Sequence, residues 1–249
     1  MSSRLGEAEL AAMQKAGKVA SGILSDLGGF IKPQISTKDI EKFFENALGE
    51  HDGMSAAFKG YSGFPAAVCV SLNDEVIHGI PSEARIVKDG DLVSVDLGIK
   101  YKGVYVDTAY TYMVGNVSDL ARKLCKVTQE ALWEGINKAL PGLRTGDIGS
   151  AVQGLAEKNG FSVVRQFVGH GIGRNLHLAP EVPNFGKKNI GFQFKENIAL
   201  AIEPMVAAGG YEVVIDSDGW TARTKDGSLS AHYEHTVDVT KNGPLVITG

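Results

Sequence analysis

Four carboxylate residues interrupt otherwise apolar, β-rich stretches of this 249-residue chain. They are Asp96 and Asp107 in VSVDLGIKYKGVYVDTAYT, Glu203 in ENIALAIEPMV and Glu234 in SAHYEHTVDV. Buried carboxylates without a partner are rare, because removing a charge from water costs free energy. A set of them in predicted strands therefore indicates either protonated groups or a bound cation.

The two aspartates belong to one predicted hairpin. A turn about Tyr101-Lys102 places Asp96 opposite Asp107 within one residue, on one face, with Cβ atoms about 4.5–5.5 Å apart. Ser94 and Gly98 share that face. The other face is apolar and carries Val93, Val95, Leu97 and Ile99. Two like charges this close repel away from water, so either one is protonated or a cation lies between them. The alternative is a pair of exposed aspartates on a solvent face.

Two histidines follow in VGHGIGRNLHLAPEVPNF, residues 168–185. Gly169, Gly171 and Gly173 disfavour a helix there, so His170 and His177 are not a helical i, i+4 zinc pair. The glycines instead allow the backbone to approach a site closely. Four carboxylates with one imidazole are typical of a two-metal site for manganese, iron, cobalt or zinc, rather than of a structural zinc.

An internal repeat positions these residues. PQISTKDI (33–40) aligns with PGLRTGDI (141–148) at an offset of 108, and Glu203 follows Asp96 by 107 residues. Each copy separates two predicted helices. These helices are 7–27 and 37–48 in the first half, and 120–140 and 147–159 in the second half. The β-rich segments are 67–72, 91–99, 104–114, 162–168, 198–204, 212–215 and 232–240.

The repeat predicts one α+β domain over residues 1–249, with pseudo-symmetric halves at about 10–114 and 118–240. A site built from both halves would lie in the cleft between them. The alternative interpretation is that both copies are merely common helix starts, because threonine and aspartate suit that position.

The amino-acid composition of the chain excludes several classes of function. The net charge of −4 gives no electrostatic case for DNA, RNA or anionic membranes. No apolar run reaches the ~20 residues of a membrane helix, and MSSRLGEAELAAMQ lacks the apolar core of a signal peptide. The two cysteines, Cys69 and Cys125, form no CxxC motif. We therefore expect a cytoplasmic protein, without a disulfide framework.

Six motifs carry a family resemblance. They are NDEVIHGIP (73–81), VDLG with Asp96, the strand with Asp107, GHGIGRNLH (169–177), AIEPM with Glu203, and DGWTARTKDGSLSAHYEHTV (218–237). In this order, over most of the chain, they resemble the type I methionine aminopeptidases. The resemblance implies the pita-bread fold, an internally duplicated α+β domain with a curved antiparallel sheet covered by helices.

The resemblance also implies a dinuclear metal centre with a bridging hydroxide that removes the N-terminal methionine from peptides and nascent chains. Asp107 and Glu234 match the bridging ligands of two divalent ions, His170 and Glu203 match ligands on one ion, and Asp96 matches the chelating ligand on the other. Glu203 would move the proton of the attacking water. His177 would hydrogen-bond the reaction intermediate, and His78 would hold the substrate backbone. The other histidines, His51, His232 and His235, are expected to be structural or to support the ligands.

The same resemblance assigns a pocket for the substrate side chain, formed by Phe58, Tyr61, Phe64, Cys69, Leu176 and Trp220. Aromatic rings with a soft sulfur suit an unbranched thioether. The chain departs from many relatives at Phe58, where they carry cysteine, at Leu176, where they carry phenylalanine, and at Leu178, where they carry an acidic residue. A monovalent-cation site of some relatives matches Asn73, Glu75 and Ser230. We expect a monomer that meets nascent chains at the ribosome.

Three alternatives fit parts of the pattern. An X-Pro dipeptidase or aminopeptidase on the same fold shares the five ligands but usually carries an additional N-terminal domain, and only 95 residues precede Asp96 here. A type II methionine aminopeptidase would need a helical insertion between Glu203 and Glu234, which are 31 residues apart. A non-catalytic binding module of this fold is expected to have lost ligands, whereas all five are present.

Overall fold

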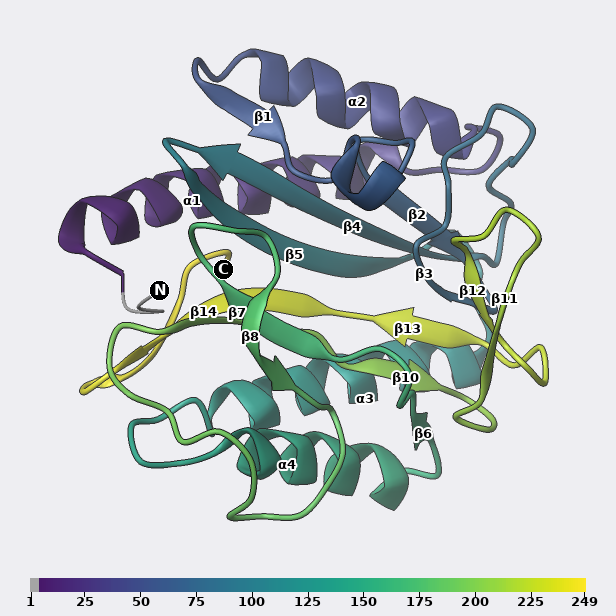
Figure 1. Cartoon of the computed structure of the whole chain (residues 1–249). Coiled ribbons are helices and arrows are strands. Elements are labelled where there is room, and N and C mark those ends of the chain that lie inside the picture. Colours follow the sequence, from purple (N-terminus) through teal and green to yellow (C-terminus); the bar gives the residue numbers. More distant parts are fainter. Residues whose placement is uncertain (1–4) are drawn as a thin grey trace.

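A curved antiparallel sheet carries two pairs of helices, one over each of its ends (Figure 1). The structure is a computed structural model that describes residues 5–249, so the first four residues of the expected domain lie outside the described part. One pair is α1 (Glu7–Phe30) with α2 (Thr37–Gly49), and the other is α3 (Asp119–Ile136) with α4 (Thr145–Lys158). None of the helices in residues 5–249 has the length and apolar character needed to cross a bilayer.

The main sheet has nine strands in the order β1-β4-β5-β14-β9-β7-β8, with β2 paired to β4 and β15 to β14. All of its neighbouring strands are antiparallel, which confirms the expected α+β class. Its strands are β1 (Met54–Ala56), β2 (Cys69–Leu72), β4 (Leu92–Tyr101), β5 (Val104–Met113), β7 (Gly169–Ile172), β8 (Leu178–Val182), β9 (Ala199–Ile202), β14 (Glu234–Thr240) and β15 (Gly243–Val246).

Two small antiparallel sheets flank the main one. The first has the order β13-β10-β6 and the second β11-β12-β3. Their strands are β3 (Glu75–Ile77), β6 (Ser162–Val163), β10 (Met205–Ala207), β11 (Val213–Ile215), β12 (Ala222–Thr224) and β13 (Ser230–His232). A short 3-10 turn, η1 (Tyr61–Gly63), lies between β1 and β2.

The repeated Thr-x-Asp-Ile motif starts α2 and α4 in the same way. Asp39 accepts a hydrogen bond from the backbone N–H of Ser36 at 2.9 Å, and Asp147 accepts one from the N–H of Arg144 at 2.8 Å. A carboxylate at this position satisfies a free backbone donor of the first helical turn and favours the helix dipole. The division into two pseudo-symmetric halves stays an interpretation of this repeat.

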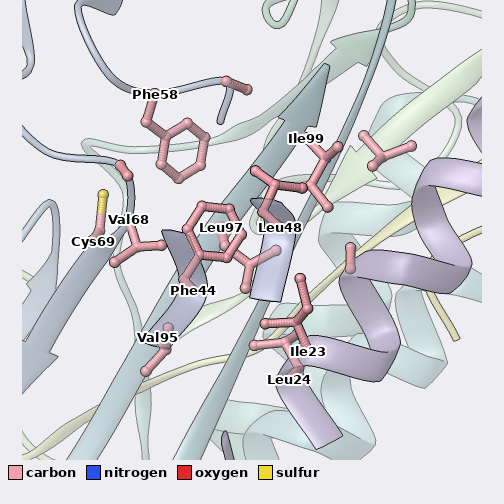
Figure 2. Packing of buried hydrophobic residues seen from close by; sticks show 14 of the residues in the cluster. Ile23, Leu24, Phe44, Leu48, Phe58, Val68, Cys69, Val95, Leu97 and Ile99 are labelled. Atoms are coloured by element: carbon pink, nitrogen blue, oxygen red, sulfur yellow. The ribbon is translucent and has the colours of Figure 1, made fainter. Parts of the chain in front are cut away.

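The helices cover the apolar face of the sheet. Val93, Val95, Leu97 and Ile99 of β4, predicted to share one face, are all fully buried. Figure 2 shows Val95, Leu97 and Ile99 packed against residues of α1 and α2. A second cluster, with Leu200 and Ile202 of β9, packs against α3 and α4. Because side chains alternate along a strand, Asp96 and its neighbours Ser94 and Gly98 occupy the face away from the helices.

The register of the β4–β5 hairpin differs from the prediction. Asp96 pairs with Ala109 and Asp107 pairs with Gly98, so the two aspartates are diagonal neighbours instead of directly opposed. The two turn residues are Lys102 and Gly103, with φ of 47° and 81°, one position later than expected. A two-residue turn with positive φ matches the twist of the strands. The shift moves the pairing by two residues, so both aspartates keep the same face.

Several element boundaries also differ from the expected ranges. Helix α3 ends at Ile136 rather than near Pro141, because Lys138 and Ala139 turn back onto Gly135 and Ile136 through tighter i→i+3 bonds. The segment 162–168 is a strand only at Ser162–Val163. The expected strand 232–240 is divided at Tyr233 into β13 and β14.

Candidate metal centre

The four carboxylates and His170 converge on the floor of one cavity. The cavity measures about 690 Å³ and lies on the face of the main sheet away from the helices. All five predicted ligands line it: Asp96, Asp107, His170, Glu203 and Glu234. The ligand atoms of Asp107, His170 and Glu234 lie within 4.8 Å of one another. Residues from both halves of the chain therefore meet at one point.

Strand pairing brings these residues together. β14 lies beside β5, with Glu234 opposite Ala109, two residues from Asp107. The backbone N–H of Asp107 also donates to Thr236 Oγ1 at 2.9 Å. On the other side β14 pairs with β9, which leads directly into Glu203, and β9 pairs with β7, where His170 faces Ala201. With Asp96 on β4, the sheet thus carries ligands on five adjacent strands or their ends.

The orientation of the His170 ring is set by its own strand. Its Nδ1 lies 3.0 Å from the carbonyl oxygen of Gly171, which makes Nδ1 the protonated donor. Nε2 then points to the carboxylates, 3.5 Å from Glu203 Oε1 and 4.0 Å from Asp107 Oδ2. Burial lowers the pKa of His170 to about 3, so the ring is neutral and Nε2 offers a lone pair. This is the usual state of a metal-binding imidazole.

The carboxylates lie in an environment that opposes their negative charge. Each is less than a tenth exposed. Burial raises the pKa of Asp96 to about 7. Burial, together with the neighbouring carboxylates, raises the pKa values of Asp107, Glu203 and Glu234 well above their ordinary range.

Three buried oxygens of this group, Asp96 Oδ1, Asp107 Oδ1 and Glu234 Oε1, have no hydrogen-bond partner. Unpaired buried oxygens next to a neutral imidazole lone pair form a donor set that fits divalent metal ions. The sequence prediction of a metal site is supported by this chemistry of the donors.

His78 and His177 also line the cavity. His78 has a positive φ of 62° and lies edge-on to Phe167, with ring centroids 5.3 Å apart. Burial lowers its pKa to about 4. His177 lies at the cavity mouth, with its ring centroid 4.2 Å from that of His170. Partial burial lowers the pKa of His177. Both rings are therefore neutral hydrogen-bonding groups at neutral pH.

An apolar pocket adjoins the carboxylates. All six residues predicted to form it line the same cavity: Phe58, Tyr61, Phe64, Cys69, Leu176 and Trp220. Phe64 and Trp220 contact edge to face, with centroids 5.2 Å apart. Cys69 pairs with Asp96 across β2 and β4, so the pocket wall and the centre share one cross-strand pair. A side chain in the pocket would therefore place its own backbone beside Asp96.

The side chains of the predicted monovalent-cation site already have partners. The carboxylate of Glu75 forms ion pairs with Arg85 and Arg223. Asn73 donates to Asp91 and accepts from the N–H of Leu92. Such a site would have to use backbone carbonyl oxygens, and it stays a prediction. The backbone of Ser230 does lie beside that of Asn73, with a hydrogen bond of 2.8 Å.

Three residues near the site had no functional role predicted from the sequence. His232, expected to be structural or supporting, is 1% exposed, and its Nε2 has no hydrogen-bond partner and lies 4.0 Å from Glu203 Oε2. Its position two residues before Glu234 was the available signal, because such residues share a face in a strand. Phe167 and Glu181 also line the cavity. They lie outside the motifs, although both flank the His170 strand.

Comparisons with known proteins agree with the site. The profile of metallopeptidase family M24 matches residues 11–241. A methionine aminopeptidase of Clostridium perfringens is 47% identical over 97% of this chain and 96% of its own length. Methionine aminopeptidase 1 of Bacillus subtilis is 44% identical over 96% of each chain. The crystal structure of methionine aminopeptidase from Thermotoga maritima matches with a TM-score of 0.96 and 42% identity, over 98% of both chains.

The chain therefore belongs to metallopeptidase family M24. Within that family it groups with the type I methionine aminopeptidases, and the predicted pita-bread fold and enzyme class are confirmed. An Xaa-Pro dipeptidase of Bacillus anthracis has the same fold, with a TM-score of 0.78, but is only 22% identical, and this chain covers 61% of it. The X-Pro enzymes and the binding modules are therefore not favoured.

Proposed function

We propose that this chain is a metal-dependent hydrolase that removes the N-terminal methionine from peptides and nascent proteins. The observation that carries the proposal is the position of the apolar pocket directly beside the buried carboxylates, through the Cys69–Asp96 pair. A methionine side chain in the pocket would present its α-amino group and first peptide bond to the centre. A longer N-terminal extension would have to pass through the carboxylates, which explains removal of a single residue.

Asp96, Asp107, His170, Glu203 and Glu234 would hold two divalent ions, with Asp107 and Glu234 shared between them. When bound, the ions supply a Lewis acid for the scissile carbonyl and lower the pKa of the attacking water. Manganese, iron, cobalt and zinc all fit an oxygen-rich set with one imidazole. Titration calorimetry and elemental analysis of the loaded protein test the number and identity of the ions.

The side chains around the centre would move the protons. Glu203 takes a proton from the attacking water and returns it to the leaving amine, so that its own charge is restored at the end of the cycle. His177 donates a hydrogen bond to the oxyanion of the tetrahedral intermediate. His78, between Phe167 and Trp220, holds the backbone of the substrate near the scissile amide.

The pocket would select the side chain. Phe64 and Trp220 form its aromatic wall, and the thiol of Cys69 adds a polarisable surface that suits a thioether. Burial keeps the pKa of Cys69 well above its ordinary value, so the group is a neutral thiol and adds no charge. Phe58 and Leu176 are nearly fully buried and would set the depth of the pocket.

The test is turnover of Met-Ala-Ser against an X-Pro tripeptide, with each of the four metals in turn. We expect the wild type to hydrolyse the methionyl bond. Asp107→Ala should abolish this activity, and His177→Ala with metal retained should reduce it at least tenfold. Preferential cleavage of the X-Pro bond would refute the proposal. Wild-type turnover by metal-loaded His177→Ala would refute the role given to that histidine.

We extend the proposal to the cellular setting. The protein acts as a monomer in the cytoplasm on nascent chains, including those at the ribosome, and a monovalent cation binds near Asn73, Glu75 and Ser230. Light scattering tests the monomer, cosedimentation with ribosomes tests the association, and replacement of potassium by tetramethylammonium tests the cation. A dimer, no cosedimentation, or turnover independent of potassium and sodium would each refute the corresponding statement.

A further inference from the structure

Tyr61 makes a direct polar contact with His177, from a segment 116 residues away in the chain. The distance between the Tyr61 hydroxyl oxygen and His177 Nδ1 is 2.9 Å, and the two ring centroids are 5.1 Å apart. Both residues line the cavity. Tyr61 is expected from the sequence only as part of the methionine pocket, so this contact gives it a second connection, to the histidine beside the centre.

The loop that carries Tyr61 is fixed by its own hydrogen bonds. The N–H of Tyr61 donates to Phe58 O at 2.9 Å, and its carbonyl accepts from the N–H of Phe64 at 2.9 Å. Gly60, Ser62 and Gly63 have φ of 82°, 49° and 91°, a left-handed path that only a tightly defined turn adopts. A closing bond of 2.8 Å joins the Gly60 N–H to Phe64 O. These bonds define the path of the backbone on both sides of Tyr61.

The contact determines which ring nitrogen of His177 is available to a substrate. Nδ1 is occupied by the hydroxyl, and Nε2 is the remaining polar atom of the ring. A phenol is a better donor than acceptor, and an unprotonated imidazole nitrogen is a good acceptor. With Tyr61 as donor, Nδ1 carries no proton and Nε2 does. A protonated Nε2 is what an oxyanion-stabilising histidine needs.

We propose that Tyr61 is a positioning residue that fixes the orientation and tautomer of the His177 ring, so that Nε2–H faces the substrate. The inference rests on the function proposed above, because it assigns a role within that reaction. His170 packs against His177 on the side of the centre, with an interplanar angle of 66°. The ring of His177 thus contacts both the His170 ring and the Tyr61 hydroxyl.

The kinetic test is a double-mutant cycle of Tyr61→Phe and His177→Ala, measured with Met-Ala-Ser. Tyr61→Phe keeps the pocket ring and removes only the hydroxyl. We expect kcat to fall about tenfold with KM within about twofold, the size of one hydrogen bond in a transition state. In the His177→Ala background the same change should alter kcat less than about twofold, because its target is gone. Tyr110→Phe is the matched control, since Tyr110 and Tyr61 are both 39% exposed.

Two kinetic outcomes would overturn the inference. One is an effect of Tyr61→Phe on KM alone, which a residue that only lines the pocket would give. The other is a full additional loss in the His177→Ala background, which would show that Tyr61 acts independently of the histidine. An effect of equal size in Tyr110→Phe would likewise assign the loss to general disturbance.

Nitrogen NMR of the His177 side chain in the zinc-loaded protein gives a readout that does not depend on turnover. The expected spectrum shows the Nε2–H tautomer in the wild type and a mixture of tautomers in Tyr61→Phe. An unchanged tautomer in the variant, or Nδ1–H in the wild type, would refute the inference. Absence of methionyl peptide hydrolysis by the wild type would instead refute the proposed function, so the two failures are distinguishable.

Discussion

Replacing Asp96 by asparagine is expected to stabilise the metal-free protein at alkaline pH. Asp96 is 7% exposed, and burial raises its pKa to about 7 from the ordinary value of 3.8. Between these pH values the folded protein keeps a proton that the unfolded chain has released. Stability contributed by this group is therefore fully present below pH 4 and is lost as the pH rises through 7.

The magnitude follows from the separation of the two pKa values. A difference of about three pH units, at about 1.4 kcal/mol each, gives a penalty of about 4 kcal/mol above pH 7. Asparagine carries no charge, so Asp96→Asn removes this penalty. It also removes the Asp96 charge that raises the pKa of Asp107, which adds to the gain. At pH 5 the gain should shrink to about 2 kcal/mol, because the wild-type group is then protonated in the folded state.

Urea denaturation in the presence of a chelator, at pH 5 and pH 8, measures these quantities. The wild type should lose stability between the two pH values, and Asp96→Asn should lose less. Asp26→Asn changes the same group at an exposed position of α1 and should have no such effect. The reasoning would be wrong if the metal-free wild type were equally stable at both pH values, or if Asp96→Asn were less stable than the wild type at pH 8.

Three further predictions concern the metal, the buried histidine and the pocket. Mn²⁺ at about one hundred times its Kd should add about 2.7 kcal/mol to the free energy of unfolding and raise Tm by roughly 5–10 °C in a calorimetric scan. Asp107→Ala should show neither effect. His232→Leu should lower kcat about tenfold with KM and metal content unchanged, because Glu203 loses its polar neighbour, and His232→Gln should recover most of it in the same assay. Gly98→Ala should destabilise the fold by about 1–3 kcal/mol and raise KM, because the new Cβ would lie 2.7 Å from the Phe58 ring and 2.9 Å from the Ala57 Cβ. In the Phe58→Ala background the same change should cost less in chemical denaturation and kinetics, with the Ala57 contact left.

The sequence was sufficient to predict which face of the sheet carries each ligand. It was not sufficient to predict which residue lies opposite that ligand on the neighbouring strand. The alternation of Val93, Val95 and Leu97 with Ser94 and Asp96 predicts which side of β4 packs in the apolar core, and the three apolar residues do lie in that core. The pairing of β4 with β5 depends on the turn, whose type is set by the backbone angles of Lys102 and Gly103. A pattern of period two cannot detect a register shift of two residues, and the prediction was wrong by that amount.

Contacts between distant segments were the least predictable part of the site. His232 lies beside Glu203 because β13 pairs with β10 and β14 pairs with β9, and neither pairing has a local signal in the sequence. The same holds for Tyr61 and His177, whose contact requires a self-closed loop. The family resemblance assigned Tyr61 to the side-chain pocket, but it did not predict the contact of Tyr61 with His177.

The arrangement of the carboxylates implies that metal binding and folding are coupled in this protein. Four acidic groups on adjacent strands oppose one another in the absence of a cation, and the buried apolar faces of the same strands must supply the stability that these groups remove. With an ion bound, the same acidic groups stabilise the fold instead of destabilising it, because the ion stabilises the ionised form that burial disfavours. Below pH 5, protons should replace the ions, so the metal-free protein should be stable but inactive there. At pH 8 the same protein should be active only when loaded, and least stable when the metal is withdrawn.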